Sequence, residues 1–303
     1  MAIEVKENVP IGPYTVYKIG GPARFFVEVK SVAETEEALR YAAERGIPFF
    51  ILGAGSNMIV SDKGCDGIVI RMTGGDVRAQ GERLIADAGV MMARAVSESA
   101  KTGLTGFEWG IGVPGTVGGS VRGNAGCFGS EMKDIVESVL VFDTLYPKRY
   151  TLNARECAFG YRDSIFKRRP EWIILSVTLK LAKGNPAAIQ ERIRQITQER
   201  VTKQDIGTKS CGCIFKNVSW TRKDIDKKKL LEAFPELEQY QDRANIPASY
   251  LLDASGCKSI RVSSVVISPK HANFFVNEGG ASAGDVKALI AKAKEKEIGR
   301  AHV

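Results

Sequence analysis

A thiol, a cation and an amide lie close together in the stretch Ser210-Cys211-Gly212-Cys213-Ile214-Phe215-Lys216-Asn217. If this stretch is a strand, side-chain alternation places Cys213 and Phe215 on one face and Ile214 and Lys216 on the other. Structural cysteines are usually buried and inert, whereas those of a site sit among charged groups. From the residues alone, a structural and a functional interpretation of Cys213 remain about even.

Two further residues have side chains that could take part in binding or catalysis. Arg162, in Tyr161-Arg162-Asp163-Ser164, offers a planar fork for a carboxylate or phosphate. The commoner alternative is a surface ion pair between Arg162 and Asp163. His271 is a lone histidine, and such a residue is more often hydrogen-bonded within the structure than catalytic.

Gly53-Ala54-Gly55-Ser56-Asn57 directly follows an apolar run. Two glycines permit a tight turn with positive φ and let backbone N–H groups approach an anion, which suits a pyrophosphate. The segment is neither a Rossmann fingerprint nor a P-loop, because its third glycine and its Gly-Lys-Ser/Thr are missing. Taken alone, a plain turn between strands is the better interpretation.

A second segment, Gly103 to Gly129, holds ten glycines in 27 residues. In its centre, Ile111, Val113 and Val117 alternate with glycine, unlike a Ser-rich flexible linker. We expect this segment to be buried against a flat ring, with Asn124-Ala125-Gly126 extending it; a structural crossover is the alternative. Two glycine-rich segments whose backbone N–H groups could bind an anion lie in the same half of the chain. Together they favour a binding site for a dinucleotide.

The composition narrows the function classes. The chain has 303 residues, 44% of them hydrophobic and 26% charged, with a net charge of +8. Only two histidines occur, which nearly excludes a histidine-rich metal centre, and we expect no metal. No apolar run approaches the roughly 20 residues of a membrane span, and Met1 to Lys6 resembles no signal peptide. We therefore expect a cytoplasmic protein whose positive charge serves polyphosphate ligands.

Local signals indicate the elements that must position these segments. Arg24–Val29 is typical of a strand, and Ser31 with Glu34 forms a capping-box signal for a helix that ends at Gly46. Further elements are expected at Phe49–Leu52 (strand), Gly67–Met72 (strand), 77–89 (hairpin), 90–101 (helix), Ile135–Phe142 (strand), Trp172–Leu181 (strand), Cys213–Phe215 (strand), Val262–Ser268 (strand) and Asp285–Lys294 (helix).

Gly184-Asn185-Pro186 is a plausible domain boundary, with Asn185 capping a helix that starts at Pro186. We expect a cofactor-binding domain over residues 1–183, in two lobes of about 1–75 and 76–183. A substrate-binding domain should occupy residues 184–303.

These segments, in this order, resemble the UDP-N-acetylenolpyruvoylglucosamine reductase (MurB) family over nearly the whole chain. The matching stretches are Ile19–Ala23, Leu52–Asn57, Gly103–Gly129, Phe159–Phe166, Gly212–Asn217 and Leu251–Asn277. The resemblance implies an α+β fold, with a two-lobed FAD-binding unit of the vanillyl-alcohol-oxidase (PCMH) type followed by an α+β substrate domain. It also implies the short-loop subtype of the family.

The implied reaction is the NADPH-dependent reduction of UDP-N-acetylglucosamine enolpyruvate through FAD, in peptidoglycan synthesis. By position, the resemblance assigns Arg162 to the substrate carboxylate and Cys213 to proton donation. It assigns the FAD to Gly53, Ala54, Gly55, Ser56, Asn57, Pro114, Gly115, Thr116, Gly118, Gly119, Asn124, Ala125 and Gly126. It assigns substrate contacts to Tyr161, Lys216, Asn217 and His271. We expect a monomer without nucleic-acid or membrane partners.

The end of the chain departs from the family pattern, which continues into a segment with a catalytic glutamate. Residues 297–303, Glu-Ile-Gly-Arg-Ala-His-Val, match one reading frame of a common sequencing adapter. We therefore expect that the native C-terminal end is missing.

Two alternatives stay open besides the reductase. One is a flavin-dependent oxidase of the same superfamily, or an FAD-binding fragment without activity. The other is a non-enzymatic binder of nucleic acid, although no recognised nucleic-acid motif or basic helix is present.

Overall fold

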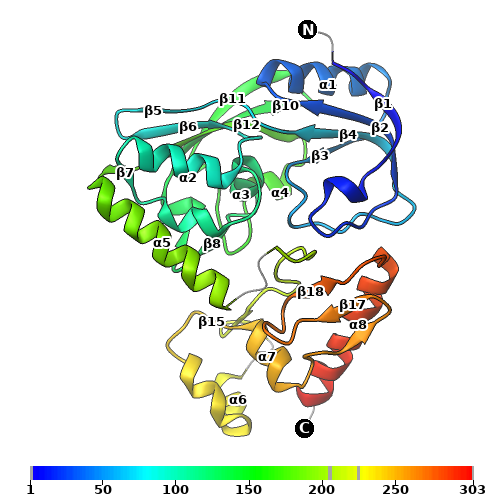
Figure 1. The fold of residues 1–303 in the computed structure, drawn as a ribbon, viewed down its shortest axis with the longest axis vertical. Helices are drawn as coiled ribbons and strands as arrows, with labels where there is room; N and C mark the ends of the chain where they lie inside the picture. The colour runs from blue at the N-terminus through cyan, green and yellow to red at the C-terminus, as the bar shows by residue number, and fades with distance from the viewer. Residues whose placement is uncertain (1–2, 204–206, 224–225, 302–303) are drawn as a thin grey trace.

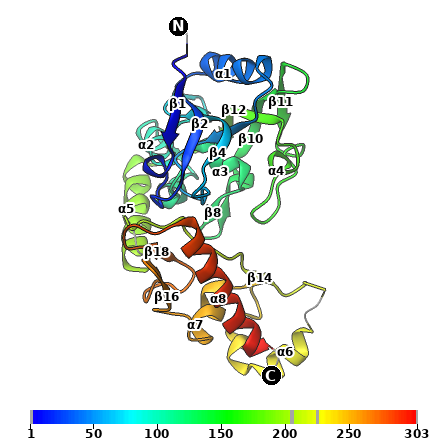
Figure 2. The same cartoon turned by 90° about the vertical axis from the view of Figure 1, so that its right-hand side faces the viewer.

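The computed structural model describes residues 3–203, 207–223 and 226–301. The chain forms two parts, one above the other in Figure 1 and Figure 2. The first part contains two sheets and the helices around them. The second part contains the chain from residue 207 onward, and helix α5 runs down the side of the first part toward it.

The first sheet has the strand order β1-β2-β4-β3. Its strands are β1 (Lys6–Pro10), β2 (Pro22–Val29), β3 (Phe49–Leu52) and β4 (Cys65–Met72). β4 runs parallel to β2 and β3, so helix α1 (Val32–Glu44) is the crossover between β2 and β3 and packs on one face of the sheet. The short 3-10 helix η1 (Gly12–Tyr14) follows β1.

The predicted start and end of helix α1 are confirmed. Ser31 Oγ accepts a hydrogen bond from the Glu34 N–H at 3.2 Å. The Glu34 carboxylate accepts from the Lys30 N–H at 2.7 Å, one residue earlier than in the usual capping box. Gly46 follows the C-cap with φ +61°, the left-handed conformation that ends many helices.

The second sheet is antiparallel, with the order β11-β10-β12-β6-β5. Its strands are β5 (Val77–Gln80), β6 (Arg83–Asp87), β10 (Val136–Asp143), β11 (Lys148–Asn153) and β12 (Trp172–Lys180). Helices α2 (Met92–Lys101) and α4 (Ile165–Arg168) pack around it. One continuous apolar cluster joins both sheets, so the two lobes share a core.

The glycine-rich segment is more regular than expected. It contains β7 (Leu104–Thr105), η2 (Glu108–Gly112), α3 (Val117–Arg122) and β8 (Gly126–Cys127). β8 pairs with β9 (Ser130–Glu131), which precedes η3 (Met132–Asp134). Val117 is fully buried in the protein core. Helix α3 therefore turns the Val117 side chain inward, and the expectation that this segment lies against a flat ring stays a prediction.

Helix α5 (Pro186–Lys203) begins as predicted, and the Asn185 side chain accepts from the Ala187 N–H at 2.9 Å. Ile189 and Ile196 are buried, and Ile196 belongs to the core of the first part. β13 (Ala182–Lys183) pairs with β7 just before this helix. The boundary proposed at Gly184 thus precedes a helix that packs on the first part, and the domain limits stay a prediction.

The second part consists of short elements. They are β14 (Val218–Ser219), α6 (Lys227–Ala233), η4 (Pro235–Tyr240), β15 (Asn245–Ile246), α7 (Ala248–Ala254), β16 (Arg261–Val262), β17 (Val265–Ile267), β18 (Phe275–Asn277) and α8 (Ala283–Ala301). The expected strand at Cys213–Phe215 is absent from this described region, because only Cys213 pairs, in a single bridge to Phe274. The end of the predicted adapter-encoded tail, residues 302–303, lies outside the described residues.

The first lobe and the second part are joined by packing. Tyr17 and Ile19 are buried in the core of the second part. Asn277 Nδ2 donates to the Tyr17 carbonyl at 2.9 Å. Within the described residues, no helix combines the length and the apolar character that a membrane span requires.

Candidate active site

The two glycine-rich segments touch one another. The Ser56 hydroxyl donates to the Pro114 carbonyl at 3.0 Å. A Cβ added at Gly53 would lie 2.6 Å from Thr116 Oγ1, and one at Gly115 would lie 3.0 Å from Ser56 Oγ. Because any larger side chain at Gly53 would push the segments apart, this contact requires glycine. Bare backbone from both lobes is therefore presented side by side.

Gly55 shapes the first of these segments. It has φ +63°, and its carbonyl accepts from the Val16 N–H at 3.1 Å. Ala54 beside it is half-buried, and Asn57 is exposed. This arrangement fits a cradle for a pyrophosphate, since the turn displays backbone and small polar groups at the surface.

Gly118 and Gly119 serve the packing of helix α3. The Gly118 N–H donates to the Ala88 carbonyl at 2.9 Å, and a Cβ at Gly118 would lie 2.7 Å from the Ala88 Cβ. The Gly119 N–H donates to Thr116 Oγ1, which caps the helix. Both N–H groups are thus already used within the protein.

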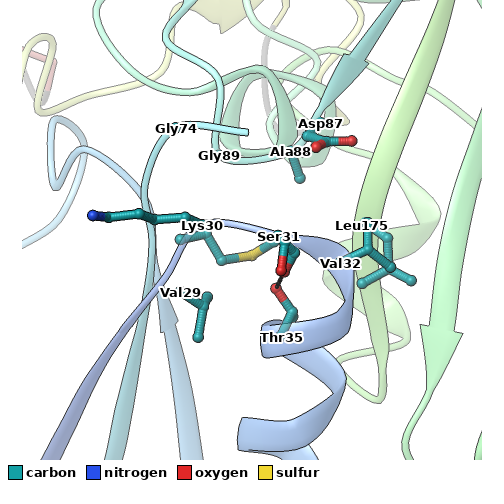
Figure 3. A pocket seen from close by; sticks show the side chains of 11 residues that line it. Val29, Lys30, Ser31, Val32, Thr35, Gly74, Asp87, Ala88, Gly89 and Leu175 are labelled. Atoms are coloured by element: carbon teal, nitrogen blue, oxygen red, sulfur yellow. Dashed lines mark hydrogen bonds between the residues drawn. The ribbon is translucent and has the colours of Figure 1, made fainter. Parts of the chain in front are cut away.

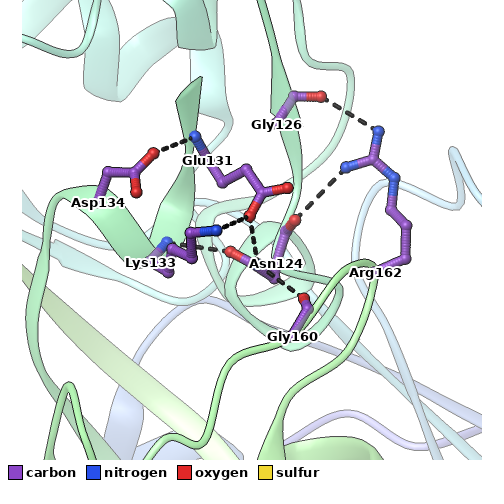
Figure 4. A network of polar contacts seen from close by, with 7 residues as sticks. All are labelled: Asn124, Gly126, Glu131, Lys133, Asp134, Gly160 and Arg162. Atoms are coloured by element: carbon purple, nitrogen blue, oxygen red, sulfur yellow. Dashed lines mark hydrogen bonds and ion pairs between the residues drawn. The ribbon is translucent and has the colours of Figure 1, made fainter. Parts of the chain in front are cut away.

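Asn124 is completely buried at the centre of a polar network (Figure 4). Its Nδ2 donates to Glu131 Oε2 at 2.9 Å and to the Gly160 carbonyl at 2.8 Å. Its Oδ1 accepts from the Lys133 N–H at 3.0 Å. Ala125 follows, half-buried, and its carbonyl accepts from the N–H of Met132.

Arg162 joins this network through backbone carbonyl groups. Its guanidinium donates to the carbonyls of Asn124 at 3.4 Å and Gly126 at 3.2 Å. Its backbone is left-handed, with φ +53°, a conformation uncommon outside glycine. The Lys167 ammonium donates to the Arg162 carbonyl at 2.7 Å. The guanidinium carbon also lies 5.6 Å from the ring centre of the exposed Tyr161.

Residues of the second part meet this site through Asn217. Its N–H donates to the Tyr161 hydroxyl at 3.2 Å, and its Oδ1 accepts from the Ala248 N–H at the start of α7. Lys216 beside it is exposed. The structure therefore brings Tyr161 and Asn217 into direct contact, although they come from different parts of the chain.

Cys213 lies within electrostatic reach of Arg162. The side chain is exposed, yet the protein packed around the sulfur raises the pKa of the thiol, while the charges of Arg162 and Arg200 act to lower it. The net shift is upward, so the thiol keeps its proton at neutral pH. The Cys213 thiol is thus close enough to the Arg162 guanidinium to feel its charge.

His271 lies beside the Cys213 segment, next to Phe274. Its ring packs edge-on against Phe274, with ring centres 4.7 Å apart. Phe274 in turn forms the bridge to Cys213. His271 is half-buried, so its predicted substrate contact stays a prediction.

Comparisons with known proteins find relatives over nearly the whole chain. Residues 23–145 match a family model described as FAD binding domain, and residues 204–298 match the UDP-N-acetylenolpyruvoylglucosamine reductase C-terminal domain. The reductase of that name from Carboxydothermus hydrogenoformans is 34% identical over 294 residues, covering 96% of this chain and 88% of the relative. The one from Alkaliphilus oremlandii is 35% identical over 296 residues, covering 97% and 88%.

A crystal structure of the reductase (MurB) from Thermus caldophilus aligns with a TM-score of 0.75 and 32% identity. The alignment covers 97% of this chain and 94% of that one. This chain belongs to the UDP-N-acetylenolpyruvoylglucosamine reductase family. The expected fold class, an FAD-binding unit followed by the family's C-terminal domain, is confirmed.

Sequence reasoning missed one residue of this reductase-family site, Arg200 in the last turns of α5. Arg200 lies against Gly112, where a Cβ would overlap its side chain, and its charge reaches the thiols of Cys127 and Cys213. Among the described residues, neither Arg162 nor Arg200 forms a salt bridge with a carboxylate; Arg162 donates to backbone carbonyls instead. Two half-buried guanidinium groups without such a partner suit an anionic ligand. In the sequence, the only hint of this contact is Gly112 in the glycine-rich segment, where the absence of a side chain makes room for Arg200.

Further cations surround the same place. Burial lowers the pKa of Lys167, and the nearby charges of Lys216 and Arg122 lower it further. Like charges crowd together in this way where an anion binds among them. The site is therefore electropositive around Lys167 and Arg162.

Hollows elsewhere in the described molecule contain none of the predicted site residues. A recess of about 10 Å³ lies between the start of α1 and the turns at Gly74 and Gly89 (Figure 3). A larger hollow of about 750 Å³ lies between the end of α1 and the turn after β10. No cluster of metal-ligating side chains occurs among the described residues.

Proposed function

We propose that this chain reduces UDP-N-acetylglucosamine enolpyruvate to UDP-N-acetylmuramate, with FAD as cofactor and NADPH as hydride donor, in peptidoglycan precursor synthesis. The observation that carries the proposal is that the Cys213 thiol lies within electrostatic reach of the Arg162 guanidinium, in a chain with an FAD-binding domain. Relatives of 34% and 35% identity over nearly the whole chain have the corresponding name.

The residues proposed to hold the flavin come from the two glycine-rich segments, chiefly Gly53 to Asn57 and Pro114 to Thr116. The close contact of Gly53 with Thr116 leaves no side chain between the segments and a bare surface for the cofactor. When bound, FAD supplies the hydride chemistry between NADPH and the enolpyruvyl double bond.

Arg162 is proposed to bind the substrate carboxylate. Two carbonyl oxygens, of Asn124 and Gly126, hold its fork in place. As hydride adds to the double bond, negative charge builds up next to that carboxylate. A preorganised guanidinium stabilises this charge without reorganising during the reaction.

Cys213 is proposed to donate the proton that completes the product. The substrate gains one hydride and one proton, so its double bond is reduced by two electrons, and the sulfur is left as a thiolate. The charges of Arg162 and Arg200 stabilise that thiolate. Solvent then returns a proton to the sulfur.

The nucleotide part of the substrate is proposed to contact Tyr161, Lys216, Asn217 and His271. Lys216 supplies a positive charge for the diphosphate. Tyr161 and Asn217 already bridge the two parts of the molecule at this place. Four expectations stay predictions: the cytoplasmic location, the monomeric state, the absence of nucleic-acid partners and the domain limits.

A two-step absorbance assay tests the proposal. NADPH added to the purified protein without oxygen should bleach the flavin band, and the enolpyruvyl substrate should then restore it with formation of UDP-N-acetylmuramate. Oxygen restoring the band much faster than the enolpyruvyl substrate would indicate an oxidase instead. A folded protein that refuses added FAD would contradict the proposal altogether.

A further inference from the structure

Every hydrogen-bonding group of the Asn124 side chain is engaged within the protein. Its two amide hydrogens are donated to Glu131 Oε2 and to the Gly160 carbonyl, and its Oδ1 accepts from the Lys133 N–H. The residue is 0% exposed. A side chain with no remaining donor and no surface has nothing to offer a cofactor.

Glu131 determines which way this amide points. An ionised carboxylate only accepts hydrogen bonds, so the nitrogen of Asn124 must face it. Glu131 is itself fixed, because its carboxylate pairs with the Lys133 ammonium at 2.8 Å and its N–H donates to Asp134 Oδ2 at 2.7 Å. The second amide hydrogen is consequently aimed at Gly160 (Figure 4).

Asn124 holds Arg162 at both of its ends. The Asn124 carbonyl accepts from the guanidinium, and the Asn124 amide grips Gly160, where the turn that carries Arg162 begins. In that turn, Gly160 and Asp163 exchange two backbone hydrogen bonds, of 3.0 Å and 3.1 Å, around the left-handed Arg162. A left-handed arginine persists only when its surroundings enforce it.

We propose that Asn124, oriented by Glu131, is a positioning residue for Arg162 instead of a ligand of the flavin. Asn124 holds the fork of Arg162 in the place where an anionic substrate group binds. The substrate part of this inference rests on the proposed function, whereas the effect on the Arg162 position does not.

Asn124→Asp is the sharpest test, because it keeps the size of the side chain but replaces a donor by an oxygen that faces Glu131 and the Gly160 carbonyl. Misplacing a reactive group by about 1 Å can cost on the order of 10²-fold in rate. We expect a loss of this order in flavin reoxidation by the enolpyruvyl substrate, and weaker binding of UDP-N-acetylmuramate in calorimetry. FAD content and flavin reduction by NADPH should change less than about twofold. A loss of FAD content or an altered flavin spectrum would identify Asn124 as a cofactor ligand and overturn the proposal.

Matched variants separate positioning from general damage. Asn153→Asp makes the same chemical change at the exposed end of β11, where Asn153 Oδ1 accepts from two backbone N–H groups. This variant should leave both half-reactions unchanged. Glu131→Gln retains an acceptor for the Asn124 amide. It should therefore slow flavin reoxidation by the enolpyruvyl substrate less than Glu131→Ala does. Asn124→Ala combined with Arg162→Ala should be no slower than Arg162→Ala alone, and additive losses would contradict the proposal.

A crystal structure of the Asn124→Asp variant decides the matter without turnover. The Arg162 guanidinium should leave the carbonyls of residues 124 and 126. If it stays there, the positioning role is wrong. If the wild-type protein fails to reduce the enolpyruvyl substrate, the proposed function is wrong, and this structural comparison still tests the role of Asn124.

Discussion

At the scale of single residues, the proposed chemistry depends on the protonation of one thiol, that of Cys213. The protein around Cys213 raises its pKa, against the opposing charges of Arg162 and Arg200. An ordinary thiol has a pKa of about 8.5. Because the shift is upward, Cys213 stays protonated to higher pH and remains competent as a proton donor throughout the neutral range.

The first prediction follows from this shift. Flavin reoxidation by the enolpyruvyl substrate should be independent of pH around neutrality and should fall only above the ordinary thiol pKa, because deprotonation removes the donor. Cys213→Ala should slow this half-reaction by on the order of 10²- to 10⁴-fold, the usual contribution of a general acid. It should leave flavin reduction by NADPH intact. Stopped-flow absorbance across pH measures both steps.

Cys213→Ser provides the matched control. A hydroxyl does not ionise in this pH range, so the serine variant should retain activity and lose the alkaline decline. If the decline persists with serine, another group is responsible for it. If both half-reactions slow together in Cys213→Ala, the donor role is wrong.

At the scale of elements, the two glycine-rich segments act as a joint surface because each allows the other to approach. Ser56 bonds to Pro114, and Gly53 abuts Thr116, whose hydroxyl also caps helix α3. A change at Gly53 therefore disturbs the turn after β3 and the start of α3 together.

The second prediction is that Gly53→Ala yields protein with little FAD. The added Cβ would lie 2.6 Å from Thr116 Oγ1 and force the segments apart. The ratio of flavin absorbance to protein absorbance measures occupancy. Gly123→Ala, at the end of α3 with φ −90° and ordinary contact at 3.5 Å, should bind FAD normally. Full FAD occupancy in Gly53→Ala would show that the segment contact is unimportant.

At the scale of the whole molecule, the second part is attached to the first lobe by buried contacts. Tyr17 and Ile19 pack in its core, and Asn277 bonds to the Tyr17 carbonyl. Asp62 accepts from the N–H groups of Ala283 at 2.7 Å and Gly284 at 3.0 Å, at the start of α8. One carboxylate of the first lobe thus caps a helix of the second part.

The third prediction concerns this cap. Asp62→Ala should lower the free energy of unfolding by about 0.5–2 kcal/mol, the usual value of a helix cap, and should speed amide exchange at the start of α8. Thermal melting and hydrogen exchange measure the two effects. Asp66→Ala is the control, because it removes a nearby carboxylate that is 84% exposed and pairs with Arg24. It should change the free energy of unfolding by less than about 0.5 kcal/mol. Equal effects of the two variants would contradict the capping role.

The sequence by itself determined the features that depend on neighbours along the chain. The start of α1 at Ser31, its end at Gly46, the hairpin turn after Gln80 and the start of α5 after Asn185 all follow from caps and turns within a few residues. The scarcity of histidine and the family motifs were equally readable. These signals suffice for element type and for family membership.

Only the tertiary structure decided which distant groups meet. The sequence favoured a strand at Cys213–Phe215, but the stretch forms only an isolated bridge, between Cys213 and Phe274. Asn124 was expected at the flavin, yet its amide is buried between Glu131 and Gly160. Arg200 had no signal of its own until α5 packed over Gly112. The reason is physical: a cap is satisfied within one turn of chain, whereas the partner of a side chain is set by how whole elements pack.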